Sequence, residues 1–237
     1  AGNISGADET AVNSFVIPSS YFVSGNNTIA VEVHQDLITS SDLSFNLELL
    51  TGGDIEPSTS LINYTDVWKF LDDGTDQGTT WIGTAFNDAT WSSGAAKLGY
   101  GGDGEATVVG LGPDANNKYV TTYFRKNFTI TNLAQYQSII LNMLRDDGAV
   151  VYVNGVEVAR DNMPAGVVNY LSFATDVIDE GTEEDTPISF ILPTSLFVEG
   201  NNTIAVEMHQ VNATSSDLGF SLELLGSQQS TGAPSIT

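Results

Sequence analysis

Residues 200–210 read GNNTIAVEMHQ and residues 25–35 read GNNTIAVEVHQ, so one sequence occurs twice in the chain with a single substitution. The match extends without a gap over Phe190–Leu225 and Phe15–Leu50, with 25 identities in 36 positions at a constant offset of 175 residues. Self-similarity at a fixed period is typical of a repeated structural unit. The sequence therefore predicts a module of about 175 residues, present once in full and once in part.

The offset divides the chain into four segments. We expect residues 1–52 to be the C-terminal part of a preceding copy and residues 53–57 to be a linker. Residues 58–226 are then the complete module, and residues 227–237 are a second linker or tail. The partial copy has too few strands to bury its apolar faces alone. Two explanations stay open: the chain belongs to a longer tandem array packed end to end, which we favour, or residues 1–52 add strands to a neighbouring chain.

The apolar pattern within the module has a period of two, which indicates strands with one buried face. Residues 204–209 and 218–224 alternate in this way, and residues 123–130 and 138–144 add two more strands. Residues 150–158 predict a hairpin, because its Asn154-Gly155 pair tolerates the positive φ angles of a type I′ turn. Short strands with turns between them, and no long amphipathic helix, favour an all-β, antiparallel jelly-roll β-sandwich.

The strongly acidic composition excludes several classes of partner. Thirty acidic and seven basic residues give a net charge of −23. This charge repels nucleic acid and anionic membranes over a Debye length of about 10 Å. No stretch approaches the roughly 18 apolar residues of a membrane span. We therefore expect no nucleic acid partner and no membrane insertion.

The absence of cysteine excludes disulfides and thiolate chemistry. A cysteine-free chain rich in threonine, serine, asparagine and glycine is typical of bacterial surface proteins, so we expect an extracellular or cell-surface location. Ala1 opens directly onto polar sequence without a signal peptide, so export requires a leader that was removed or lies upstream.

Three motifs in order carry a family resemblance. Residues 86–91 (FNDATW) are followed by Leu98–Gly101, by NMLRDDGAVVYVNGVEVAR at residues 142–160, and by the strand Leu196–Glu207. Together they resemble galactose-binding-like jelly-roll modules, among them the N-terminal sandwich domain of family 2 glycoside hydrolases. A looser likeness, through Asp146-Asp147, is to the PA14 sandwich. The resemblance implies a binding or scaffold domain and a calcium ion that braces the sandwich, with any catalysis on another domain.

Carboxylates in glycine-rich loops supply the hard oxygen ligands that calcium prefers. The candidate calcium ligands are Asp72, Asp73, Asp76, Asp103, Asp146 and Asp147. The same residue types also form ordinary turns. A catalytic pair of acids needs one partner with a raised pKa, whereas acids in such loops are typically solvated. We therefore expect that the protein is not an enzyme.

Aromatic rings and a repeated histidine are the other candidates for ligand contact. Flat rings stack on ligands, and the candidate ligand-binding residues are Trp68, Trp81, Tyr100, Tyr170, Glu207 and His209. The alternative for the tryptophans is a place in the core. Alternation puts His209 and Glu207 on the face opposite Val206, where the alternative is a surface histidine that fixes the turn at residues 215–217.

Two functions compete. The first is a non-catalytic extracellular repeat module of a structural or adhesive surface protein, such as a fibre, stalk or matrix, whose partners are copies of itself or neighbouring modules. The second is a carbohydrate-binding module attached to a secreted polysaccharide hydrolase, whose partner is a polysaccharide. The tandem repeat favours the first, and the family resemblance favours the second.

Overall fold

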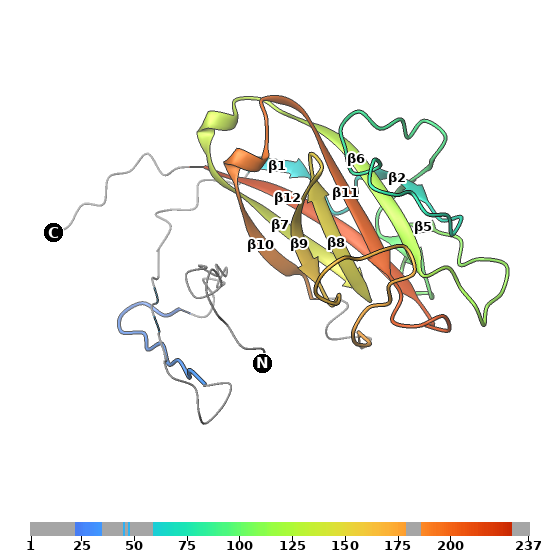
Figure 1. Cartoon of the computed structure of the whole chain (residues 1–237). Helices are drawn as coiled ribbons and strands as arrows, with labels where there is room; N and C mark the ends of the chain where they lie inside the picture. Colours follow the sequence, from blue (N-terminus) through green and yellow to red (C-terminus); the bar gives the residue numbers. More distant parts are fainter. Residues whose placement is uncertain (1–21, 35–44, 46, 48–58, 179–185, 229–237) are drawn as a thin grey trace.

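A computed structural model describes residues 22–34, 45, 47, 59–178 and 186–228. All of its strands lie between Thr59 and Gln228 (Figure 1). The helical turns in this described part are too short to cross a membrane. The predicted linker at residues 53–57 lies outside the described residues, as do most of residues 1–52 and the end of the predicted tail.

One sheet has the strand order β10-β7-β12-β4-β5, and β1 also pairs with β12. All of its pairs are antiparallel except β4 with β5. Its strands are β1 (Thr59–Ile62), β4 (Leu98–Tyr100), β5 (Thr107–Val108), β7 (Tyr136–Asp146), β10 (Ile188–Pro193) and β12 (Leu218–Gln228).

The second sheet has the order β3-β2-β6-β11-β8-β9 and is antiparallel throughout. Its strands are β2 (Val67–Leu71), β3 (Ser92–Ala95), β6 (Thr121–Ile130), β8 (Gly148–Val153), β9 (Val156–Asp161) and β11 (Gly200–His209). Two short 3-10 turns, η3 (Leu133–Gln135) and η4 (Thr194–Leu196), precede β7 and β11. The predicted all-β antiparallel sandwich is confirmed.

The main core lies between the two sheets. Phe220 of β12 stacks on Phe124 of β6 with ring centroids 4.5 Å apart, and it meets the edge of Trp68 of β2 at 4.9 Å. The inward residues of β11, Ile204 and Val206, are also fully buried. Because these rings and branched chains leave water completely, they supply most of the free energy that holds the sheets together.

The hairpin between β8 and β9 turns at the predicted Asn-Gly pair. Asn154 has a φ of 51° and Gly155 a φ of 87°, as a type I′ turn requires. The Asn154 side-chain amide also donates to the Leu196 carbonyl at 3.0 Å and to Asn202 Oδ1 at 2.8 Å. The turn residue therefore anchors the hairpin to the segment that leads into β11.

The prediction that β11 has one buried face is wrong. Ile204 and Val206 face the main core, but Glu207 and His209 on the opposite face are buried as well. The reason is that loops from residues 72–91 and 162–178 pack against this second face. Periodicity within a strand does not reveal such a cover, since the loops are distant in sequence.

Candidate functional site

An aromatic cluster joins the loop before β3 to the outward face of the second sheet. The rings of Trp81 and Trp91 lie 6.4 Å apart and nearly parallel. Trp81 also meets the edges of Tyr123 at 4.8 Å and Tyr152 at 5.8 Å, and Phe86 packs on Trp91 at 5.6 Å. These contacts form a second small core outside the sandwich, which holds the loop in one position.

Arg125 of β6 fixes the same loop by hydrogen bonds. Its side chain is fully buried and points to the outward face of the sheet. The guanidinium donates to Asp88 Oδ2 at 3.0 Å, to the Gly83 carbonyl at 3.2 Å and to the Trp81 carbonyl, and its carbon lies 5.1 Å from the centre of the Phe86 ring. A planar fork of donors can satisfy several acceptors at once, which a lysine cannot. Arg125 therefore determines the shape of residues 81–88.

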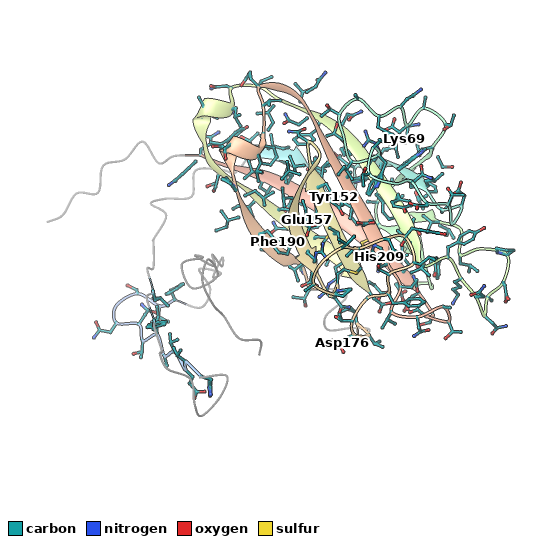
Figure 2. All side chains as sticks on the ribbon, in the orientation of Figure 1. Lys69, Tyr152, Glu157, Asp176, Phe190 and His209 are labelled. Carbon is teal, nitrogen blue, oxygen red and sulfur yellow. The ribbon has the colours of Figure 1, made fainter. Side chains whose placement is uncertain are left out.

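Glu207, Tyr152 and His209 form a polar network beneath the loops, and Figure 2 labels Tyr152 and His209. The Tyr152 hydroxyl donates to Glu207 Oε1 at 2.6 Å, and Glu207 Oε2 lies 3.4 Å from His209 Nε2. His209 Nδ1 is 2.8 Å from the Ser172 carbonyl and 2.9 Å from Thr121 Oγ1. A carbonyl only accepts, so Nδ1 carries a proton. The network ties the loop at residues 162–178 to β11.

The environment of this network disfavours ionised tyrosine. Burial raises the pKa of Tyr152 far above its ordinary value, and the hydrogen bond to Glu207 and the charge of that residue raise it further. Burial and the charge of Glu207 raise the pKa of Tyr123 in the same way. Both phenols therefore stay neutral at physiological pH, and Tyr152 acts as a donor to the carboxylate.

Most of the predicted ligand-binding residues are closed off from solvent. Trp68 and Tyr100 belong to the main core, and Trp81 belongs to the aromatic cluster. His209 is fully buried, so it is neither a ligand contact nor the predicted surface histidine. These four residues are corrected to packing and hydrogen-bonding roles, because loops and the facing sheet cover them. Tyr170 is half-buried against the aromatic cluster, and its carbonyl accepts from Thr121 at 2.9 Å.

Two of the predicted calcium ligands shape their own turns, and a third bonds to a distant loop. Asp73 accepts from the amide of Thr75 at 3.0 Å, and Asp76 accepts from the amide of Gly78 at 2.8 Å. Asp72 accepts from a glycine amide in the loop after β5. The fourth loop residue, Asp103, is exposed, and its carbonyl accepts from Lys97 Nζ at 3.3 Å.

The remaining pair, Asp146 and Asp147, is buried at the end of β7. Asp147 accepts from the amides of Ile178 at 3.2 Å and Val211 at 2.7 Å and from Ser215 Oγ at 3.3 Å. Its carboxylate thus joins the turn between β7 and β8 to two loops, one that contains Ile178 and one that contains Val211 and Ser215. No group of three or more metal-binding side chains was found in the described part of the chain. Calcium binding stays a prediction.

Two open pockets flank the loop that Arg125 holds. The first, which we call the loop pocket, has a volume of about 570 Å³ and is lined by Thr79, Thr80, Ile82, Gly83, Ala85, Phe86, Asn87 and Gly155. The second has a volume of about 230 Å³ and is lined by Thr84, Asn127, Phe128, Thr129, Asn201 and Thr203. The segment 83–85 contributes to both pockets, so it is the wall between them. Neither lining contains a charged residue.

Sequence reasoning missed the residues that define this site. Phe86 and Asn87 were noticed only as part of a family motif, and Arg125 was not noticed at all. The structure alone reveals that β6 buries five residues in a row, with Arg125 as the last of them. A strand that buries both faces places a charged residue inside only when partners are provided.

No protein-family model and no curated protein sequence matches the chain. Several solved structures are similar to it. Bacteroides uniformis β-glucuronidase 2 has a TM-score of 0.46 and 19% identity, with 71% of this chain and 18% of that chain covered. The β-glycosidase from Bacteroides vulgatus has a TM-score of 0.41 and 19% identity, with 69% and 20% covered. The uncultured Clostridium sp. β-glucuronidase has a TM-score of 0.44 and 13% identity, with 78% and 31% covered.

The predicted resemblance to family 2 glycoside hydrolases is confirmed as a similarity of structure, since two further matches carry that family in their descriptions. The prediction that the protein is not an enzyme is corrected: the matching structures are glycosidases, and the likeness leaves catalysis by this chain undecided. The chain spans less than a third of the length of each.

Proposed function

We propose that the module binds a neutral carbohydrate in the loop pocket. The observation that carries the proposal is a pocket of about 570 Å³ whose lining combines apolar side chains with hydroxyl and amide groups. This volume lies within the range of about 300–1,000 Å³ that is usual for small-molecule sites.

The lining matches the two-sided chemistry of a sugar ring. Ile82, Ala85 and the Phe86 ring offer apolar surface to the C–H faces of a pyranose. Threonine hydroxyls and the Asn87 side chain offer hydrogen bonds to its hydroxyl groups. No basic side chain lines the pocket, and the chain carries a net charge of −23, so an uncharged glycan is favoured over one rich in carboxylates.

The loop needs little reorganisation on binding. Arg125 bonds to residues 81, 83 and 88, and Trp91 packs under Phe86, so the lining is held before a ligand arrives. Preorganisation lowers the conformational entropy lost on binding. A fixed loop is the usual requirement for specific recognition by a scaffold of strands.

The proposal favours the carbohydrate-binding reading of the sequence over the structural or adhesive one. An accessory module that places a hydrolase on a polysaccharide requires a pocket of this kind, whereas a spacer in a fibre does not. The proposal rests on the pocket and not on the similarity to glycosidases. An extracellular location agrees with it and stays an expectation.

The test combines a glycan array with titration calorimetry on the full chain. Ala85→Asp places a charge in the pocket at an exposed position, and Ala89→Asp places the same charge on the same loop outside the lining. We expect a neutral glycan class to bind, Ala85→Asp to weaken binding at least about tenfold, and Ala89→Asp to change it by less than about twofold. Absence of binding across the array, or an unchanged affinity in Ala85→Asp, would overturn the proposal.

A further inference from the structure

The partial copy forms the same local turn as the complete module. Asn27 Oδ1 accepts from the Val23 amide at 2.8 Å, and Asn27 Nδ2 donates to the carbonyls of Val23 at 2.8 Å and Gly25 at 3.1 Å. Asn202 makes the same three bonds to the equivalent residues at 2.9, 2.8 and 3.0 Å. The glycine φ angles, 103° and 92°, also agree. The same local sequence therefore forms the same turn in both copies.

The side chains that follow this turn differ sharply in exposure. Val31 is 47% exposed and Phe45 is 54% exposed, whereas the equivalent Val206 and Phe220 are both 0% exposed. Ile29, Val33 and Leu47 are exposed in the same way. Burying a side chain of this kind stabilises a protein by roughly 1.5–3 kcal/mol. Residues 22–34, Phe45 and Leu47 therefore expose apolar side chains whose equivalents in the complete module are buried.

The polar side of the segment repeats the same contrast. His34 Nε2 lies 3.2 Å from Glu32 Oε2 with both side chains exposed, and His209 Nε2 lies 3.4 Å from Glu207 Oε2 with both buried. The pair of residues is thus identical in the two copies. The exposure of the pair is what differs between the two copies.

The surroundings that bury this sequence are known from the module. β11 lies between β6 and β8, and β12 lies between β7 and β4, with β1 beside its end. β10, β11 and β12 pack against the strands formed by residues 59–178. We call the place that these three strands occupy the slot. The described residues contain a single slot, and residues 190–225 fill it.

The connection allows the partial copy to reach the same slot. Thr59 of β1 pairs with Gly226 of β12, and the 175-residue offset makes Thr51 the equivalent of Gly226. Residues 52–58 then need to cross only one interstrand spacing of about 5 Å. A seven-residue connection spans that distance without threading through another loop.

We propose that residues 15–50 are a docking segment for this slot, and that they compete for it with residues 190–225 of the same chain. The substitutions explain why residues 190–225 hold it. Ser44 replaces Gly219, which lies between Gly99 of β4 and Asp146 of β7 in the sheet. Asn46 replaces Ser221, which is buried and donates to the Tyr64 carbonyl at 2.7 Å.

The test weakens the resident copy in the full chain and observes the other one. Phe220→Asp places a charge in the core, and Phe45→Asp makes the equivalent change in the docking segment. Hydrogen exchange is measured on residues 26–34. We expect these amides to exchange at least about tenfold more slowly in Phe220→Asp than in the unsubstituted chain. The double variant should lose both this protection and the cooperative unfolding transition, and Phe45→Asp alone should unfold like the unsubstituted chain.

A milder variant tests the same competition without a buried charge. Gly219→Ser with Ser221→Asn gives the resident copy the residues of the docking segment at two positions, so residues 26–34 should show partial protection. Protection that appears together with a dimer also supports docking, since the slot then belongs to a second copy. Two outcomes would overturn the proposal. The first is that the amides of residues 26–34 stay unprotected in both variants. The second is that Phe220→Asp and the double variant have the same unfolding transition.

Discussion

Replacing Arg125 by lysine is the sharpest perturbation of the site. Lysine keeps the positive charge near Asp88 but loses the fork that also reaches the carbonyls of Trp81 and Gly83. Removing one partner of a buried charge pair costs about 3–5 kcal/mol. Since lysine retains the charge and one contact, we expect a loss of about 2–4 kcal/mol in the free energy of unfolding. For a domain of this size the unfolding temperature should fall by roughly 4–16 °C.

The matched control is Arg160→Lys. Arg160 also donates to a carboxylate, that of Glu157, and to two carbonyls, those of Pro164 and Gly166, but its ion pair is partly exposed. The control therefore isolates the effect of burial, and we expect a loss of about 1 kcal/mol or less. Thermal and urea unfolding of both variants give the comparison, and calorimetry tests whether glycan binding weakens in Arg125→Lys alone. Equal losses in the two variants would refute the role assigned to Arg125.

Three further outcomes are expected. Replacing Asn154-Gly155 by two valines should cost about 1–3 kcal/mol, because both positions have positive φ, and urea unfolding measures it. Burial raises the pKa of Tyr64 to about 12 and that of Tyr152 further, so the free energy of unfolding present below pH 10 should decline as the pH rises towards 12. In pH-dependent melts, Tyr152→Phe should make this decline less steep. At neutral pH the same variant should cost about 1–3 kcal/mol, because Glu207 loses a hydrogen bond. Calcium should raise the unfolding temperature, and a chelator should reverse this rise. An unfolding temperature that responds to neither would contradict the prediction of a bound calcium ion.

The strands were predictable because their signals are local. The alternation in residues 204–209 and the Asn154-Gly155 pair depend on neighbours in sequence, and the structure contains the strand and the turn that they predict. The site was not predictable in the same way. Its cover comes from residues 72–91 and 162–178, which have no periodic pattern and acquire their shape from distant contacts with Arg125 and His209.

The same difference explains the errors among the aromatic candidates. A tryptophan in a strand and a tryptophan in a loop look alike in sequence as possible platforms. Trp68 is buried between the sheets, and Trp81 is buried by the loop's own packing on Tyr123. The apolar surface of the pocket instead comes from Ile82, Ala85 and Phe86, none of which was a candidate for ligand contact.

The pairing of β1 with β12 also determines how the module responds to a pulling force. The strands are antiparallel and Thr59 lies opposite Gly226, so the first and last strands meet at one end of the sandwich (Figure 1). Tension applied through the two termini would load the hydrogen bonds of this short pair one after another, because these bonds run perpendicular to the strands. The module would therefore open like a zipper from β1 at low force, and Ile62 would be the first residue to leave the main core.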